Sequence, residues 1–164
     1  MILKETMNTI NFKSDFKDAL IEFASRRTRT HWLTLNCNYF LSNKEALKRL
    51  KRWRVEMLRR LHGKHFYRLP ENELFQFFGT IEQTLGGKPH FHFACAVPIH
   101  LTERFLRHAE QRWLASTPSG SCHIVPIDDK PDSVTNVLGY ALKDMNPSSA
   151  VPFIDSRLFL WGSI

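Results

Sequence analysis

Two stretches of alternating apolar and polar residues, joined by the pair Gly86-Gly87, constrain the fold of this chain more than any other feature. Leu74 to Thr84 (LFQFFGTIEQT) and His90 to Val97 (HFHFACAV) have the two-residue period of strands with one buried face. Adjacent glycines between two such strands are typical of a tight hairpin turn. The sequence therefore predicts an antiparallel hairpin within a larger sheet.

Further strand and helix patterns flank this hairpin on both sides. The basic helix begins at Ser42 or Asn43 and ends near Gly63, and Asn146-Pro147 stops the last helix. The order of elements is strand, helix, strand, strand, helix, strand, with expected strands over 31–40, 74–84, 90–97 and 122–127 and helices over 43–63, 102–115 and 133–145. This order predicts an α+β fold, a ferredoxin-like or RRM-like split β-α-β core with a central antiparallel sheet.

Additions are expected at both ends of this core. Residues 14–29 have helical spacing, and the tail after the last helix has a short apolar segment around Arg157–Leu160 that suits an edge strand. We find no repeats, no low-complexity segment and no linker between domains. We therefore expect one domain over residues 1–164, with an N-terminal helical extension (1–29), a core (30–146) and a C-terminal tail (147–164).

The composition bounds the class of protein. Hydrophobic residues make up 43% of the 164 residues, enough for the core of one domain. Three cysteines without a CxxC pair exclude a disulfide scaffold and suit a reducing compartment. No apolar run approaches the roughly 18 residues of a membrane span, and the first residues lack an apolar signal-peptide core. We therefore expect a soluble, intracellular protein with no membrane partner.

The net charge of +7 is concentrated in one segment. Between Lys44 and Arg68 there are ten Lys and Arg residues, opposed only by Glu45 and Glu56, which gives 10 − 2 = +8. A solvated helix face and a membrane-surface helix have similar patterns. A concentration this one-sided favours a polyanion as partner, and nucleic acid above all. The residues that we expect to contact it are Lys48, Arg49 and Arg52.

Two histidines stand two residues apart on the second strand of the hairpin, so their side chains leave the same face. The apolar row that alternates with His90 and His92 is expected to enter the core and consists of Phe91, Phe93, Cys95 and Val97. The histidines therefore lie on the opposite, open face, beside alanines too small to cover them. A pair of polar residues on a solvated face has the same pattern, so the residues of the neighbouring strand are needed to distinguish a metal site from a solvated pair.

The neighbouring strand offers a carboxylate on that face. A three-residue turn, Gly86-Gly87-Lys88, would place Glu82 directly opposite His92, whereas a two-residue turn would bring Gln83 opposite His90 and turn Ile81 outward. The hydrophobic pattern prefers Glu82. Two histidines and one carboxylate with open positions suit a divalent metal ion that also holds a substrate oxygen.

A tyrosine on the last expected helix lies outside its apolar stripe. Tyr140 is about 130° from the centre of that stripe, on the same side as Asn136 and Lys143. An exposed tyrosine is often only an amphipathic rim residue. A phenol can also act as a nucleophile on phosphorus, and Lys143 at i+3 can reach the same substrate charge.

Three segments together resemble a known family. LTLN at 33–36, PHFHFACAV at 89–97 and GYALKD at 139–144 are similar to the three ordered motifs of the HUH endonucleases. The closest branch is the single-tyrosine rolling-circle replication initiators of plasmids, phages and viruses. The resemblance implies Mg²⁺ or Mn²⁺ held by His90, His92 and Glu82. It implies attack of Tyr140 on single-stranded origin DNA, leaving a 5′-phosphotyrosine and a free 3′-OH, with Lys143 stabilising the phosphate charge.

The same resemblance implies partners and a compartment. Single-stranded DNA, in the form of an origin hairpin, is the expected substrate, and Asn36 and Asn136 are added to the expected DNA contacts. No GxxxxGK[ST] motif is present, so this sequence has no helicase module, either because the chain is a nuclease domain or because the host supplies unwinding. Host helicase and polymerase are the expected partners. The expected compartment is the cytoplasm of a bacterial or archaeal host, or the host nucleus for a eukaryotic virus.

Two alternatives stay open. A single-tyrosine transposase of the same superfamily has the same motifs, and Lys143 favours replication over transposition. A non-catalytic RRM-like module would use Phe78 on the open sheet face to stack bases and the basic helix to bind phosphates.

Overall fold

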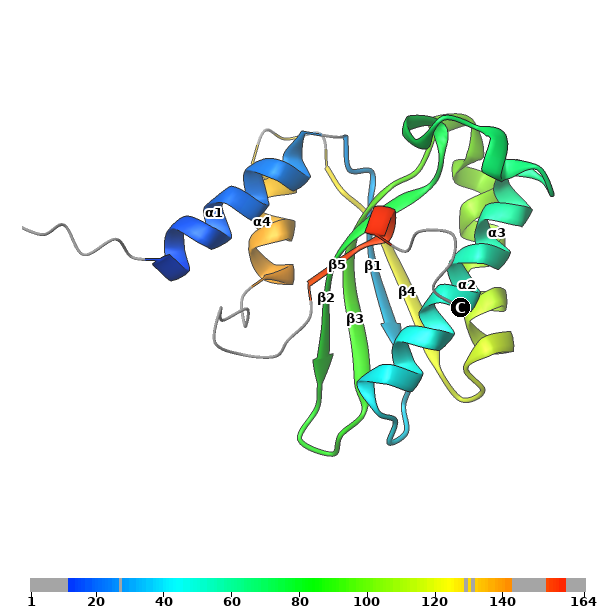
Figure 1. Ribbon diagram of the computed structural model, residues 1–164, viewed down its shortest axis with the longest axis horizontal. Coiled ribbons are helices and arrows are strands. Elements are labelled where there is room, and N and C mark those ends of the chain that lie inside the picture. Colours follow the sequence, from blue (N-terminus) through cyan, green and yellow to red (C-terminus); the bar gives the residue numbers. More distant parts are fainter. Residues whose placement is uncertain (1–11, 27, 129, 131, 143–152, 159–164) are drawn as a thin grey trace, which may run out of the picture.

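Nine helices and strands make up the regular structure of the computed structural model, which describes residues 12–26, 28–128, 130, 132–142 and 153–158. Short 3₁₀ turns connect several of them. In chain order the elements are α1 (Phe12–Ser25), β1 (His31–Asn36), α2 (Asn43–His62), β2 (Gln76–Gln83), β3 (Pro89–Ala96), α3 (Thr102–Ser116), β4 (Ser121–Pro126), α4 (Ser133–Ala141) and β5 (Phe153–Asp155) (Figure 1).

The five strands form one antiparallel sheet in the order β4-β1-β3-β2-β5. The hairpin β2–β3 and the two helical crossovers α2 and α3 together produce the arrangement β4-β1-β3-β2, which is the topology of a split β-α-β unit. This confirms the predicted α+β, ferredoxin-like core. β5 is the addition at the β2 edge.

The edge strand lies earlier in the chain than predicted. The sequence placed it around Arg157–Leu160, but β5 ends at Asp155 and Ser156–Leu158 form a 3₁₀ turn. The carboxylate of Asp155 accepts a hydrogen bond from the backbone N–H of Arg157 at 2.9 Å and pairs with its guanidinium. This local contact holds the chain in a turn at the point where the predicted strand would begin, and residues 159–160 of that predicted strand lie outside the described residues.

The two crossover helices α2 and α3 cover one face of the sheet. The hydroxyl of Ser42 accepts a hydrogen bond from the backbone N–H of Glu45 at the start of α2, and Gly63 follows its end with φ +83°. Trp53 of α2 is fully buried, and its indole N–H donates to the carbonyl of Ala109 on α3 at 3.0 Å. The core on this face is rich in aromatic residues, among them Phe75, Phe77, Phe91, Phe93 and Trp113.

The helices α1 and α4 lie on the other side of the sheet (Figure 1) and cover part of its second face. Leu138 and Leu142 pack on Phe78 and Ala94, which are 1% and 0% exposed. Phe78 and Ala94 were predicted to lie in an open row, and this prediction was wrong. The apolar stripe of α4 needs a partner, and these two residues of β2 and β3 provide it.

The hairpin has the predicted three-residue turn, but one residue earlier than predicted. The turn residues are Leu85-Gly86-Gly87, closed by hydrogen bonds between Thr84 and Lys88 (3.1 Å) and between Gly87 and Thr84 (2.8 Å). Gly87 takes the left-handed conformation, with φ +66°, that such loops require. Glu82 therefore pairs with His90 rather than with His92. Since the shift in pairing is two residues, every side chain keeps its predicted face.

Candidate metal centre and tyrosine site

Three potential metal ligands converge on the second face of the sheet. Glu82 comes from β2, and His90 and His92 come from β3. Glu82 Oε2 lies 3.1 Å from His90 Nε2 and 3.6 Å from His92 Nε2. One ligand atom from each residue lies within 4.8 Å of the others, so the group can hold a metal ion. The three side chains are 11–19% exposed, which leaves the site open to a ligand from solvent.

The second carboxylate oxygen of Glu82 supports the binding of a cation by this group. Glu82 Oε1 is buried and has no hydrogen-bond partner among the described residues. A carboxylate oxygen removed from water without a partner is costly, and a cation between the carboxylate and the imidazoles would offset that cost. The residues therefore fit a divalent ion, and a carboxylate with two imidazoles is a donor set for Mg²⁺, Mn²⁺ or Zn²⁺.

The strand β1 positions His92. Thr34 pairs with His92 across the β1–β3 ladder, and its hydroxyl lies 3.3 Å from His92 Nδ1. In the tautomer with the proton on Nδ1, the ring donates to this hydroxyl and the lone pair of Nε2 faces Glu82, as a metal ligand requires. Thr34 thus orients the ring of His92.

An aromatic cluster adjoins the metal group. The indole of Trp32 stacks on the ring of His92 with centroids 5.5 Å apart and planes 13° apart. Tyr140 of α4 stands edge-on to both rings, with its centroid 5.8 Å from each. Tyr140 is 51% exposed, so a ligand from solvent can reach it. The structure therefore brings together Tyr140 and His92, which are 48 positions apart in the sequence.

Trp32 is a site residue that sequence reasoning missed. A signal was available: Trp32, Thr34 and Asn36 alternate with the buried Leu33 and Leu35. Once β1 is placed beside β3, this alternation puts all three on the histidine face. Asn36 pairs with His90, and its amide donates to the Ser121 hydroxyl at 2.9 Å.

The basic residues predicted to bind DNA lie on the other side of the sheet. Lys48, Arg49 and Arg52 belong to α2, which packs on the face opposite to the metal group. The guanidinium of Arg49 donates to the carbonyl of Ser116 and lies over the ring of Tyr39, so it has a structural contact. Asn136 is exposed on α4, on the tyrosine side, and Lys143 lies outside the described residues.

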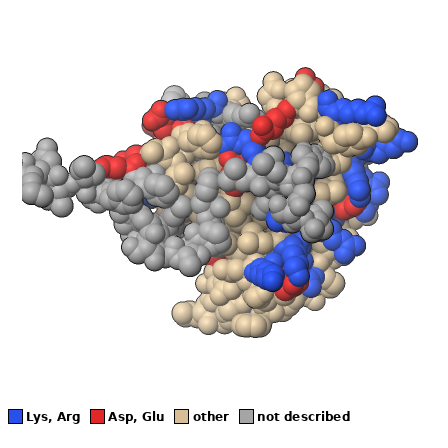
Figure 2. All heavy atoms as spheres, viewed as in Figure 1, with Lys and Arg blue, Asp and Glu red and all other residues tan. Residues whose placement is uncertain are grey.

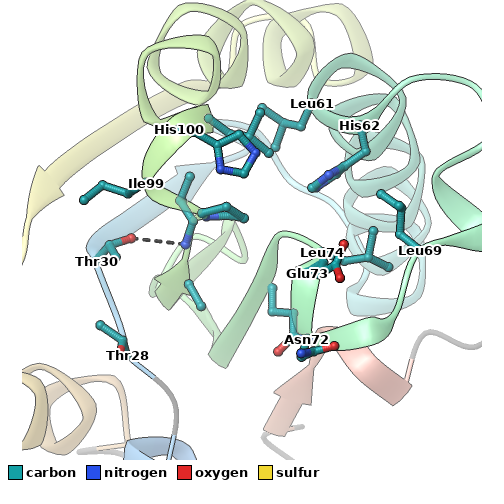
Figure 3. Close-up of a pocket in the computed structure, with 15 residues that line it drawn as sticks. Thr28, Thr30, Leu61, His62, Leu69, Asn72, Glu73, Leu74, Ile99 and His100 are labelled. Atoms are coloured by element: carbon teal, nitrogen blue, oxygen red, sulfur yellow. Dashed lines mark hydrogen bonds between the residues drawn. The ribbon is translucent and has the colours of Figure 1, made fainter.

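A cavity of about 920 Å³ lies at the other end of the strands (Figure 3). Leu61 and His62 from α2, Thr30 and the segment after β3 contribute to its walls. His62 Nε2 accepts a hydrogen bond from the backbone N–H of Phe75 at 3.2 Å. Burial, followed by the nearby His100 and Arg104, lowers the pKa of His62, which favours the neutral ring that this bond needs. None of the metal ligands lines this cavity.

Cys37 and Cys95 are buried and Cys122 is half-buried, and the burial of Cys95 was predicted from its place in the apolar row of the second hairpin strand. Burial raises the pKa of Cys37 to about 11 and that of Cys122 to about 12, and it raises the pKa of Cys95 as well. Protonated thiols are poor nucleophiles and poor metal ligands. The candidate chemistry of this protein therefore belongs to the oxygen and nitrogen ligands and the phenol.

Comparison with known proteins leaves the function open. No family model matches the chain, and no curated protein matches it. A solved structure of the hypothetical protein ORF119 from Sulfolobus islandicus rod-shaped virus 1 is similar at 18% identity, with a TM-score of 0.47, over 82% of this chain and 97% of that chain. None of the helices in the described segments is long and apolar enough to cross a membrane.

Proposed function

We propose that this protein is a metal-dependent endonuclease that nicks single-stranded DNA at a replication origin through a covalent tyrosine–DNA intermediate. The observation that carries the proposal is the position of Tyr140. Its half-exposed ring stands beside His92, which belongs to the one cluster of candidate metal ligands found among the described residues. A nucleophile next to a cation site is the arrangement that phosphoryl transfer needs.

The roles of the residues follow from this arrangement. Glu82, His90 and His92 hold a divalent ion, Mg²⁺ or Mn²⁺, which polarises the scissile phosphate when bound. The phenol oxygen of Tyr140 attacks phosphorus and loses its proton, and the bond from phosphorus to the 3′ oxygen breaks. The departing oxygen takes up a proton and becomes the 3′-OH that primes synthesis. The reverse reaction rejoins the strand, so cleavage and joining use the same groups.

Three further residues have proposed roles, one based on the family resemblance and two on their position in the fold: Lys143, Asn36 and Asn136. The family resemblance assigns Lys143 to the phosphate charge. Asn36 and Asn136 lie on the same side of the sheet as Tyr140 and are proposed to contact the single strand. The proposed partners are the host helicase and polymerase, in the compartment where the replicon is copied.

Two alternative functions, a transposase and a non-catalytic RRM-like module, differ in how well they fit the structure. A transposase of the same superfamily would use the same site, so only the DNA substrate distinguishes it from an initiator. A non-catalytic RRM-like module needs an exposed aromatic platform on the sheet, and its candidate Phe78 is 1% exposed beneath α4. The burial of Phe78 therefore favours the nuclease over the binding module.

Covalent trapping tests the proposal. The protein is incubated with Mn²⁺ and a pool of single-stranded DNAs that carry candidate origin hairpins and the native replicon's origin, and adducts are separated on a denaturing gel. Tyr140→Phe removes only the phenol oxygen. Tyr67→Phe is the matched control, since Tyr67 is 52% exposed and Tyr140 is 51% exposed. We expect an adduct that needs Mn²⁺, survives in Tyr67→Phe and is lost in Tyr140→Phe. An active origin that yields no adduct, or an adduct that persists in Tyr140→Phe, would overturn the proposal.

A further inference from the structure

The strongest concentration of charge on the molecule is separate from the proposed nuclease site. α2 carries eight Lys and Arg residues against two Glu residues within 20 positions. In Figure 2, blue side chains follow the side of the molecule that α2 occupies in Figure 1. A DNA strand with its scissile phosphate at Tyr140 would have to pass around the edge of the sheet to reach α2. The positive charge on α2 therefore calls for a different segment of the nucleic acid from the one that reaches Tyr140.

Four exposed cations of α2 lie along one side of the helix. Lys44, Lys48 and Arg52 follow one another at intervals of four residues, and Arg59 extends the same side of the helix. We call these four residues the outer ridge. At 1.5 Å per residue the outer ridge is about 22 Å long. Lys48 pairs with Glu45, and Arg59 pairs with Glu56, whereas Arg52 forms no ion pair within the described part of the chain.

The neighbouring helix α3 adds to this surface. A hollow of about 240 Å³ between α2 and α3 is lined by Arg52, Trp53, Glu56, Arg112, Ala115 and Ser116. Arg112 Nε is buried and has no hydrogen-bond partner among the described residues. Arginine forks suit phosphate oxygens, and the only carboxylate that lines this hollow, Glu56, is already paired with Arg59.

The rest of α2 excludes the other common partners of a basic helix. Its apolar residues are committed to the core, since Leu50, Trp53 and Met57 are fully buried, so no apolar face remains to enter a bilayer. Sites for single-stranded nucleic acid combine charge with exposed aromatic platforms. The one aromatic residue of α2, Trp53, is buried, so the helix offers contacts to phosphates and none for stacking.

We propose that the outer ridge of α2, with Arg112 of α3, binds the phosphate backbone of double-stranded DNA on the side of the sheet opposite to the nuclease site. This deepens the proposed function, because it assigns the single-stranded and duplex parts of an origin to different faces. It depends on that function only in expecting DNA as the partner, since duplex binding is measured without cleavage.

The experiment compares two double variants that remove the same charge. Lys44→Gln/Arg52→Gln alters the outer ridge. Arg26→Gln/Lys130→Gln removes two exposed cations elsewhere. Fluorescence anisotropy with a labelled 20-base-pair duplex, titrated at several salt concentrations, gives the affinity and its salt dependence. Each lost phosphate contact lowers the slope of log K against log salt by about 0.9. We expect the ridge variant to lose about 1.8 in slope and roughly tenfold or more in affinity.

The outcomes separate this inference from the proposed function. Unchanged duplex affinity in the ridge variant, or an equal loss in the control pair, would overturn the inference. The inference would also be overturned if the ridge variant lost more affinity for single-stranded DNA, or for phosphatidylserine vesicles, than for the duplex. If ridge-dependent duplex binding is found and no tyrosine adduct forms on any DNA, the nuclease proposal fails and the duplex surface stands. If the adduct forms and the ridge has no effect, the reverse holds.

Discussion

On the face of the sheet that α2 and α3 cover, large aromatic side chains fill the core, whereas the opposite face is covered only in part. Phe78 and Ala94 lie beneath α4 at one end of that second face. At the other end, Glu82, His90 and His92 stand together with one carboxylate oxygen left without a partner among the described residues. Both faces belong to the same three central strands. The first is built for stability, and the second keeps an uncompensated polar group, which proteins retain where they need it for function.

The largest expected effect tests whether stability comes mainly from the first face. Trp53→Ala removes a fully buried indole and its hydrogen bond to Ala109, so we expect a loss of about 3–5 kcal/mol in unfolding free energy. Trp32→Ala on the second face removes a half-exposed ring and should cost about 1 kcal/mol or less. Urea unfolding of both variants measures the difference. Equal losses would break the comparison between the two faces.

The metal group gives the next largest effect. Glu82→Gln keeps the shape of the side chain and removes the charge that a cation needs, so we expect Mn²⁺ affinity to fall about a hundredfold or more. Isothermal titration with Mn²⁺ measures it. Glu73→Gln is the control, since Glu73 is exposed and lies away from the metal group. The metal site is refuted if Glu82→Gln binds Mn²⁺ as well as Glu73→Gln does.

A smaller effect sharpens the role of β1 on the second face. Thr34→Val is similar in volume but lacks the hydroxyl that lies 3.3 Å from His92 Nδ1. Because the ring then loses the contact that orients it, Mn²⁺ affinity should fall about tenfold. Thr34→Ser restores the hydroxyl and should restore the affinity. A loss of affinity in both variants would mean that the methyl group, through packing, matters more than the hydrogen bond.

The parts of this fold that sequence could predict are those encoded by short-range periodicity. The alternation of PHFHFACAV placed His90 and His92 on one face and Phe91 and Phe93 on the other, and the structure confirms both placements. The helix α2 covers the apolar row, so its cations lie on the face away from the histidines. The concentration of charge in this segment did not indicate the separation, which depends on the fold.

What sequence could not predict depends on contacts between distant segments. The exact turn residue decides whether Glu82 meets His90 or His92, and two glycines in succession leave that choice open. The burial of Phe78 requires knowing that α4 returns over the second face from 60 residues further along the chain. The stacking of Trp32 on His92 likewise depends on β1 pairing with β3, which a local pattern does not specify.

The smallest expected effect concerns pH and again separates the faces. His62, beside the aromatic core, accepts a hydrogen bond from the backbone of Phe75 through a neutral ring, and its pKa in the folded protein is lowered by burial. The unfolded chain therefore binds this proton more readily, so the stabilisation is complete above the unfolded pKa of about 6.5 and decreases as pH falls below it. This stabilisation is at most that of one hydrogen bond, about 0.5–1.5 kcal/mol. His31, also buried with a lowered pKa, contributes with the same sign.

His62→Gln keeps an acceptor that does not titrate, so the unfolding free energy of this variant should fall less than that of the wild type between pH 7 and pH 5. Parallel pH profiles for the two proteins would show that the ring of His62 is protonated equally in the folded and unfolded states, and the hydrogen bond to Phe75 would then not require its neutral form.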